Sequence, residues 1–471
     1  MPMPKLKTLT TRQYVAVSTV LGLLAATGAV ALAGPWDSGQ RKAERELAGP
    51  RVSVGGAHHP DPARTRAPAP APSAPGVLAA LGNPGNVPAQ QTLAAALDPL
   101  LTDPALGSVR TAAVIDTATG RLLYGSGADR AMTPASTVKL ATTTAALSVL
   151  GPGHRIATTV DATPDGKHLT LVGGGDPTLS KDRLRALADD TVRVLRDRGV
   201  TSVDLSYDTS LYEGPEIHPI GINNNIAPVV ALMTDEGRVD GSDHGPAPRT
   251  GDPAGDTARA FAEMLADRGV TADPGSAPAR PAAGSVPVAR TYSDPLSALV
   301  ERALTNSDND LAEALARQTA LAAGEPASFE GAGRAVKAQL DKLRLPVSDA
   351  QFADGSGLDR NDKVTAALLA TVLARAADQA HPKLRPVLTG LPIAGFSGTL
   401  ADRYTGSASG TGLVRAKTGT LTGVNTLAGT VVATDGRLLS FAFLASDTAS
   451  PFSAQPALDR LATALATRKL S

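Results

Sequence analysis

Ser136 and Lys139 form the single Ser-x-x-Lys sequence of the chain, and they stand at the start of an apolar run with helical spacing. A serine hydroxyl is a weak nucleophile until a neighbouring base takes its proton. A lysine three residues further along a helix lies on the same face as the serine, one turn away. It can accept that proton only when it is neutral, which burial or a nearby cation favours. The pair therefore predicts Ser136 as the nucleophile of an acyl-transfer reaction and Lys139 as its base.

Two further short motifs follow in the sequence, and their residues could complete such a site. Ser307 and Asn309 flank Asp308, and Lys417 opens a Lys-Thr-Gly sequence. Ser307 could relay a proton between Lys139 and a leaving nitrogen, and the Asn309 amide could bind a peptide group of the substrate. Lys417 could provide the cation that lowers the pKa of Lys139. Asp308 is expected to be a structural or capping residue rather than a catalytic acid.

The residues around the third motif are expected to bind substrate from an edge strand. Thr418 together with Lys417 could receive a carboxylate, and Gly419 would let a substrate backbone approach the strand. The backbone N–H groups of Ser136 and Thr420 would form the oxyanion hole. This chemistry needs no metal and no organic cofactor, so none is predicted.

Each motif alone has an ordinary structural explanation. Ser136 could simply cap a helix, and Lys139 could be a solvated surface lysine. Short motifs of this kind are expected about once by chance in a chain of this composition. All three motifs occur here once, in a fixed order and in suitable local settings, so the catalytic interpretation is favoured.

The overall composition excludes several functions. The chain has 471 residues, of which 42% are apolar, which is enough for two or three units with a substantial core. A formal net charge of +0 provides no electrostatic attraction for nucleic acid. Cysteine is absent, so a disulfide framework, a thiol nucleophile and a Cys-ligated zinc site are all excluded.

The N-terminus has the pattern of a targeting segment. Lys5, Lys7 and Arg12 precede an uncharged, mostly apolar run at residues 14–33, and Ala31 and Ala33 form a small-x-small cleavage site. Residues 1–33 are therefore either a cleaved signal peptide or an N-terminal membrane anchor, since about 20 apolar residues can span a bilayer. Both interpretations predict export of the rest of the chain. Residues 34–90 are rich in proline and alanine, which predicts a disordered linker.

The remaining chain is expected to form one α+β domain with a second domain inserted in it. Strands are predicted at residues 111–116, 121–124, 414–417, 426–434 and 437–445, the last two as a hairpin around Asp435 and Gly436. Helices are predicted at residues 92–101, 136–150, 296–304 and 457–470, with another after Asn309. Strands at both ends of the sequence with helices between them indicate that residues 91–155 and 291–471 form the catalytic domain.

Residues 156–290 are expected to form the inserted small α/β domain. Strands are predicted there at residues 169–172 and 203–205, and helices at residues 182–198 and 256–269. Gly174 and Gly175 follow the first of these strands. No Gly-Lys-Ser/Thr comes after them and no helix opens on them, so a phosphate-binding loop is not predicted.

The three motifs and their order resemble the D-alanyl-D-alanine carboxypeptidase/endopeptidases of the low-molecular-mass class C penicillin-binding proteins, peptidase family S13. The resemblance covers most of the chain from about residue 100 to the end and includes four shorter motifs. These are residues 171–179, residues 227–229 with 237–240, the Asp-Gly-Ser-Gly-Leu sequence at residues 354–358, and residues 398–400 with Arg403. The resemblance implies a catalytic domain of the serine β-lactamase and penicillin-binding-protein transpeptidase type, in which helices flank an antiparallel sheet.

The resemblance also implies a serine-type D-Ala-D-Ala carboxypeptidase that acts on peptidoglycan stem peptides, with possible endopeptidase action on D-Ala cross-links. Ser136 would attack the carbonyl of the penultimate D-Ala, terminal D-Ala would leave, and water would release the acyl-enzyme. β-Lactam antibiotics would be covalent inhibitors. The expected location is the cell envelope, outside the cytoplasm, with membrane contact only through the N-terminal segment.

Two features depart from the family pattern. Asp359 stands where the family more often has serine. The spacing of 171 residues between Ser136 and Ser307 is short for the family. It predicts that one inserted subdomain is missing or trimmed near residues 240–255, which would change the surface that docks substrate rather than the catalytic core.

Two other functions stay open at this stage. A class A β-lactamase needs a glutamate near an asparagine in a separate loop for deacylation. The nearest such pair, Glu301 and Asn306, has an extra residue and abuts the second motif, which suggests a coincidence on a helix. The second alternative is a non-catalytic sensor that binds peptidoglycan or β-lactams, and the intact set of motif residues argues against it. Turnover of substrate, as opposed to binding alone, separates the enzyme from the sensor.

Overall fold

The computed structural model describes residues 90–275, 277–404 and 409–467. The predicted targeting segment at residues 1–33 and nearly all of the predicted linker lie outside the described residues. Gln90, the last residue of that linker, begins the first described helix, α3 (Gln90–Leu101).

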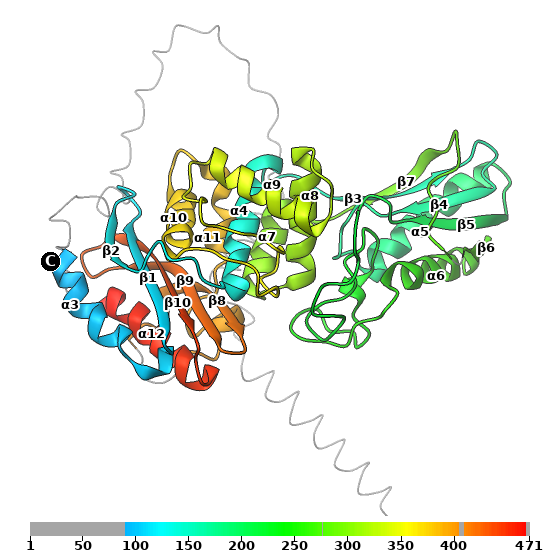
Figure 1. Cartoon of the computed structure of the whole chain (residues 1–471). Coiled ribbons are helices and arrows are strands. Elements are labelled where there is room, and N and C mark those ends of the chain that lie inside the picture. Colours follow the sequence, from blue (N-terminus) through cyan, green and yellow to red (C-terminus); the bar gives the residue numbers. More distant parts are fainter. Residues whose placement is uncertain (1–89, 276, 405–408, 468–471) are drawn as a thin grey trace, which may run out of the picture. The chain divides into compact units, whose positions relative to one another are not determined.

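Five antiparallel strands form the first sheet, in the order β2-β1-β10-β9-β8 (Figure 1). The strands are β1 (Val109–Asp116), β2 (Leu122–Ser126), β8 (Val414–Leu421), β9 (Val424–Val432) and β10 (Leu438–Ser446). β1 pairs with β10 from Val109↔Ser446 to Asp116↔Leu439, which joins the N-terminal hairpin to the C-terminal one. All the strands predicted for this region are found, with their ends displaced by a few residues.

Apolar side chains cover both faces of this sheet. In β1 the side chains alternate, so Ala112 and Val114 pack with α3 and α12 (Pro451–Thr467), whereas Ala113 and Ile115 pack with the central helices. Figure 1 shows α3 and α12 on one side of the sheet and the central helices on the other. The sheet is therefore the middle layer of three, as the transpeptidase-type fold requires.

The central helical layer contains the helices that carry or support the first two motifs. Its members are α4 (Lys139–Leu150), α7 (Leu296–Thr305), α8 (Asn309–Ala323), α9 (Phe329–Lys342), α10 (Ala366–Ala377) and α11 (Pro386–Thr389). The sequence analysis makes no prediction for α9 and α10. Both begin at hydroxyl caps, because Ser328 accepts from the Gly331 N–H and Thr365 accepts from the Leu368 N–H.

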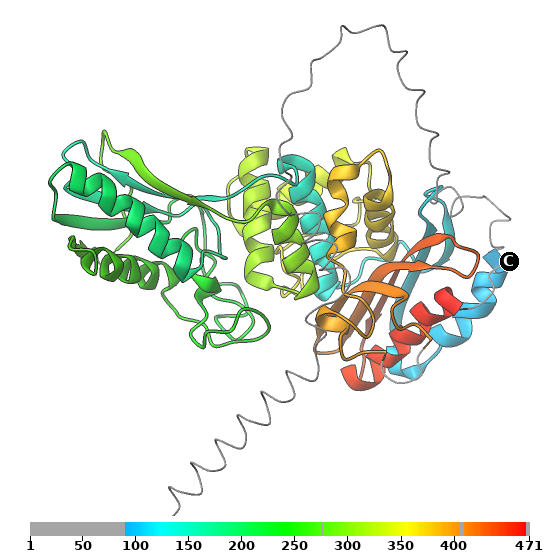
Figure 2. The same cartoon turned by 180° about the vertical axis from the view of Figure 1, so that it is seen from behind.

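A second, mixed sheet is built entirely from residues between the two parts of the first. Its order is β6-β5-β4-β3-β7, with β5 parallel to both β4 and β6 and the other pairs antiparallel. The strands are β3 (Ala157–Ala162), β4 (His168–Val172), β5 (Ser202–Asp208), β6 (Thr271–Pro274) and β7 (Val286–Tyr292). The helices α5 (Lys181–Asp197) and α6 (Pro253–Ala266) cover one face, as Figure 2 shows from behind.

Alternation along β5 explains why only one face of the second sheet carries helices. Val203, Leu205 and Tyr207 are buried in the core with α5 and α6, whereas Ser202 and Asp204 are exposed. This is the pattern of a sheet with one packed and one solvated face.

Among the helices of residues 90–467 that the structure describes, none is both long enough and apolar enough to cross a membrane.

Candidate active site

Ser136 lies on a 3₁₀ turn (Ala135–Val138) that leads directly into α4 at Lys139. The left-handed φ of +48° at Ala135 turns the chain sharply after Pro134. The Ser136 Oγ then lies 3.0 Å from the Lys139 Nζ. The serine borders a cleft while the lysine is fully buried behind it, so the spacing of three residues brings the two groups together as predicted.

Lys139 has three oxygen neighbours, and each comes from a different part of the chain. Its Nζ lies 3.0 Å from Ser136 Oγ, 2.7 Å from Asn309 Oδ1 and 2.6 Å from the backbone oxygen of Ser356. The last two oxygens can only accept hydrogen bonds. A neutral amine has two N–H groups and one lone pair, so donation to these two acceptors leaves the lone pair facing the Ser136 hydroxyl.

Burial lowers the pKa of Lys139 to about 8, against the opposing effect of Asp354 and more distant carboxylates. Lys417 is also fully buried, and burial together with the charge of Lys139 lowers its pKa well below the usual value. The charge of Lys139 thus disfavours a charged Lys417. The predicted effect in the other direction, of Lys417 on the pKa of Lys139, stays a prediction. The larger cause in both cases is burial.

Ser307 joins the second motif to the third. Lys417 donates from Nζ to Ser307 Oγ at 2.8 Å and to the backbone oxygen of Thr418 at 2.8 Å. Ser307 has a φ of +58°, a left-handed conformation that is uncommon for a residue with a side chain. Such backbone strain clusters at functional sites, where the surrounding structure holds it in place.

The third motif lies on the outer edge of the first sheet, because β8 is its last strand. The N–H of Ala416 points outward and donates to the Pro392 oxygen at 3.0 Å. Because strand residues alternate, the N–H groups of Thr418 and Thr420 point to the same outer edge. That edge borders the cleft, so an N–H of Thr420 directed at a substrate carbonyl is compatible with the observed strand.

Gly419 is needed for a reason that differs from the predicted one. A Cβ at this position would lie 2.1 Å from Thr426 Oγ1 and 2.8 Å from the Pro134 oxygen. The glycine therefore lets β8 approach the turn that carries Ser136, and its predicted role of admitting a substrate backbone stays a prediction.

Asn309 is the first residue of α8, and its amide has two fixed contacts. Its Oδ1 faces Lys139, while its Nδ2 donates to the backbone oxygen of Asn225 at 2.9 Å. Asp308 precedes it as the helix cap and accepts from the Leu311 N–H at 3.0 Å, which confirms the predicted capping role.

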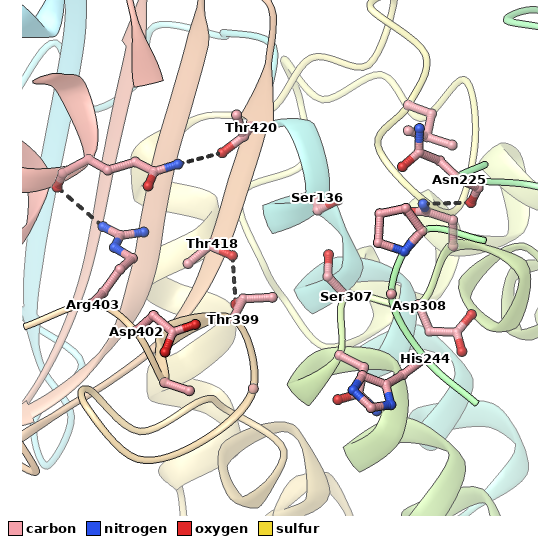
Figure 3. A pocket seen from close by; sticks show the side chains of 18 of the residues that line it. Ser136, Asn225, His244, Ser307, Asp308, Thr399, Asp402, Arg403, Thr418 and Thr420 are labelled. Carbon is pink, nitrogen blue, oxygen red and sulfur yellow. Dashed lines mark hydrogen bonds between the residues drawn. The ribbon is translucent and has the colours of Figure 1, made fainter. Parts of the chain in front are cut away.

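A cleft of about 730 Å³ runs past these groups. Figure 3 shows Ser136 and Ser307 between the strand that carries Thr418 and Thr420 and the segment that carries Asn225. Five of the eight predicted site residues border the cleft, namely Ser136, Ser307, Asn309, Thr418 and Thr420. Lys139 and Lys417 lie behind them, each within hydrogen-bond distance of one of the two serines.

The turn at residues 354–358, which supplies the Ser356 oxygen to Lys139, is not among the site residues predicted from sequence. Gly357 adopts a φ of +86°, and a Cβ there would lie 2.1 Å from the Ala135 oxygen. The turn is thus packed directly against the chain that carries Ser136. The Asp-Gly-Ser-Gly-Leu sequence could have indicated this turn, but in the sequence it serves only as a motif of the family resemblance.

Two clusters of buried acidic and histidine side chains could be taken for metal sites. They are His218 with Glu313 and Asp354, and Glu236 with Asp308 and Asp310. In the second cluster three arginines balance the three carboxylates, with Arg238, Arg249 and Arg302 in contact with Glu236, Asp310 and Asp308 respectively. In the first cluster Asp354 already accepts several hydrogen bonds. The donor sets therefore fit ion pairing and hydrogen bonding better than metal coordination.

The three-layer fold, with a serine and a lysine on a helix start facing an edge strand, defines the class of serine β-lactamases and penicillin-binding proteins. Comparison of the sequence assigns the chain to the D-Ala-D-Ala carboxypeptidase 3 (S13) family, which it matches over residues 93–247 and 242–465. The chain belongs to this family. The match divides at residues 242–247, inside the region where the spacing predicts a trimmed subdomain.

Individual relatives agree with this assignment. The chain is 38% identical over 433 residues to carboxypeptidase DacB of Mycolicibacterium smegmatis, covering 86% of this chain and 91% of the relative. It is 36% identical over 425 residues to carboxypeptidase Rv3627c of Mycobacterium tuberculosis, covering 86% and 90%. Penicillin-binding protein 4 of Haemophilus influenzae has the same fold, with a TM-score of 0.64 at 21% identity over 79% of this chain and 97% of that one.

Proposed function

We propose that this protein is a serine D-Ala-D-Ala carboxypeptidase that acts on peptidoglycan stem peptides through an acyl-enzyme on Ser136. The observation that carries the proposal is the set of three oxygens around Lys139 Nζ, which directs the lone pair of a neutral lysine at the Ser136 hydroxyl. Membership of the S13 family and the names of the relatives support the same substrate class.

Acylation starts when Ser136 Oγ attacks the carbonyl carbon of the penultimate D-Ala and its proton passes to Lys139. The N–H groups of Ser136 and Thr420 stabilise the oxyanion. Collapse of the tetrahedral intermediate breaks the C–N bond. Ser307, held by Lys417, relays the proton that Lys139 took from Ser136 to the leaving nitrogen, and free D-Ala departs with the neutral lysine restored. Water then hydrolyses the ester and restores the Ser136 hydroxyl.

The remaining site residues bind rather than react. Asn309 holds a peptide group of the substrate, and Thr418 on the outer edge of β8 receives the terminal carboxylate, with Lys417 buried behind it. Peptides with larger leaving groups, such as D-Ala cross-links, are cleaved by the same steps. β-Lactams acylate Ser136, and slow hydrolysis of that ester makes them inhibitors.

We also infer the organisation and location of the chain. Residues 91–155 and 291–471 form the catalytic domain, and residues 156–290 form an inserted domain that supplies Asn225 and His244 to the cleft. The protein acts in the cell envelope, and residues 1–33 either anchor it or are removed as a signal peptide.

Intact-mass analysis of the full chain after incubation with penicillin tests the proposal, with peptide mapping and a Ser136→Ala control. The expected result is a stable adduct on Ser136, absent in the variant, followed by release of D-Ala from a D-Ala-D-Ala peptide. Rapid hydrolysis of penicillin would favour the β-lactamase alternative. Retained labelling of Ser136→Ala would disprove the nucleophile, and binding without reaction would favour the non-catalytic sensor.

A further inference from the structure

The turn at residues 354–358 holds its shape through two buried carboxylates. Asp354 Oδ1 accepts from the N–H groups of Ser356 at 3.0 Å and Gly357 at 2.6 Å. Glu313 Oε1, from α8, accepts from the N–H groups of Gly355 at 3.0 Å and Ser356 at 3.0 Å. The backbone oxygen of Ser356 is consequently fixed at 2.6 Å from Lys139 Nζ.

His218 reaches this turn from the inserted region. Its side chain is fully buried, and its Nε2 lies 2.9 Å from Asp354 Oδ2. Its Nδ1 accepts from the Ile220 N–H at 3.3 Å, so the hydrogen of a neutral imidazole resides on Nε2 and points at Asp354. The ring of Phe329 packs edge-on against the imidazole at 5.4 Å between centroids and fixes its orientation.

We propose that His218 is a positioning residue for Lys139, acting through Asp354 and the turn at residues 354–358. The contact sequence runs from His218 Nε2 to Asp354 Oδ2, from Asp354 Oδ1 to the Ser356 and Gly357 N–H groups, and from the Ser356 oxygen to Lys139 Nζ. This inference rests on the proposed function, because it assigns to the inserted region a part in activating the Ser136 nucleophile.

Charge provides a second link between His218 and Lys139. The carboxylates that act on Lys139 are Glu313 and the capping Asp308 from α8, and Asp354 and Asp362 from the 354–362 region. The charge of Lys139 in turn lowers the pKa of Lys417 on β8. Asp354 is the strongest of the carboxylates that favour the charged lysine. A donor on Asp354 partly offsets that negative charge and so favours the neutral, basic form of Lys139.

The protonation state of His218 does not change the direction of its effect on the pKa of Lys139. Burial alone would lower the pKa of His218, but the hydrogen bond to Asp354 and the charges of Glu313, Asp354 and Asp359 raise it overall. A neutral imidazole and an imidazolium both donate from Nε2 to Asp354. Removal of the donor therefore raises the pKa of Lys139 in either case.

The test compares His218→Phe with His218→Gln in the full chain, by the rate of acylation with penicillin from pH 6 to pH 10. Phenylalanine keeps a ring against Phe329 but has no donor, whereas glutamine reaches about as far and keeps an N–H for Asp354. We expect His218→Phe to acylate about tenfold to a hundredfold more slowly, since small displacements of catalytic groups cost this much. The rising part of its pH–rate profile should move to higher pH. His218→Gln should keep both the rate and the pH–rate profile of the unchanged chain.

A matched control is His168→Phe. His168 also pairs with an aspartate in the inserted region, with Nδ1 at 3.2 Å from Asp204, but both side chains are exposed and distant in sequence from the turn. This variant should react like the unchanged chain. Equal rates for His218→Phe and the unchanged chain would overturn the inference, and so would equal losses in both His218 variants with an unmoved pH–rate profile. Failure of the unchanged chain to acylate would instead refute the proposed function.

A second measurement covers the case in which His218→Phe does not fold. Nitrogen-15 spectra of the histidines in the unchanged full chain should show a neutral ring with its hydrogen on Nε2, or a doubly protonated ring, assigned by its loss in His218→Gln. Acylation of Ser136 alters the contacts of Lys139, so the His218 signals should shift on reaction with penicillin. An unchanged spectrum would overturn the coupling.

Discussion

At the scale of single residues, the site depends on a lysine that is buried among acceptors. Lys139 has no solvent contact, and its position among Ser136, Asn309 and Ser356 leaves one direction for a lone pair. Burial makes the neutral form accessible near physiological pH, and the hydrogen bonds direct it at the nucleophile. Neither effect alone would make an effective base.

The first prediction concerns the pH dependence of acylation. Burial lowers the pKa of Lys139 to about 8. The neutral form is the base, so the acylation rate should rise about tenfold per pH unit below this value and level off above it. At pH 7 roughly a tenth of the lysine is neutral. Stopped-flow acylation with a chromogenic β-lactam measures the profile, and a rate that falls as pH rises from 6 to 8 would contradict the assignment.

The second prediction removes the base. Lys139→Ala should slow acylation by about 10²–10⁴-fold, which is the usual contribution of a general base. Arg360→Ala is a useful control, because its guanidinium binds the Thr422 oxygen at an exposed position near the turn. That variant should fold and acylate Ser136. A Lys139→Ala protein that reacts as fast as the unchanged chain would show that another group takes the proton.

At the scale of elements, the site is assembled where close-packed turns meet. The turn at residues 354–358 lies against the 3₁₀ turn before α4, and β8 lies against the same 3₁₀ turn from the other side. Gly357 and Gly419 permit these two approaches, since a Cβ at either position would overlap backbone oxygen atoms. Two elements far apart in sequence thereby pack against the turn that carries Ser136.

The third prediction tests this packing with Gly357→Ala. The φ of +86° disfavours alanine, and the new Cβ would lie 2.1 Å from the Ala135 oxygen, so the turn must move away from Lys139. Acylation should fall about a hundredfold, because a shift near 1 Å has effects of this size. Gly199→Ala is the matched control, with a φ of +67° and no atom within 4 Å of the added Cβ. It should cost only about 1 kcal/mol of stability and leave acylation unchanged. Equal effects of both variants on acylation would refute the packing argument.

At the scale of the whole described molecule, the residues between the two parts of the first sheet contact α8 through a buried ion pair and hydrogen bonds. Arg249 forms an ion pair with Asp310 of α8, with 3.0 Å between Nη2 and Oδ2, and the Ala227 N–H donates to the other Asp310 oxygen at 2.8 Å. Asn225 fixes the amide of Asn309 in the same region. The insert therefore contributes to the geometry of the second motif, in addition to bordering the cleft.

The fourth prediction concerns this ionic contact. Asp310→Ala removes the carboxylate that lies 3.0 Å from the buried Arg249, and loss of one partner of a buried ion pair typically costs about 3–5 kcal/mol of unfolding free energy. Urea unfolding followed by far-ultraviolet circular dichroism measures the change. Arg259→Ala provides the comparison, since its ion pair with Asp252 is exposed and should contribute at most about 1 kcal/mol. Similar losses in the two variants would contradict the view that the buried pair joins the insert to the core.

Local sequence signals were sufficient for much of the fold. The hairpin around Gly436 was recognised from its Asp-Gly pair, and α5 and α7 from apolar residues at helical spacing. β3 and β7 were missed, because short strands have weak local patterns and β7 pairs with a strand more than a hundred residues away, although β3 also pairs with the nearby β4. α9 and α10 were missed although Ser328 and Thr365 are good caps, since their packing against other helices decides their place.

By itself the sequence determined which residues to propose for the chemistry, because Ser136, Lys139, Ser307, Asn309 and Lys417 have side chains with the required reactivity in recognisable order. The tertiary structure alone decided how they are tuned. The Ser356 oxygen is a backbone group, which no side-chain motif can reveal. His218 and Asp354 are 136 residues apart in sequence, and only folding places them together. A pKa set by burial depends in the same way on everything that surrounds the group, which is a property of the whole fold.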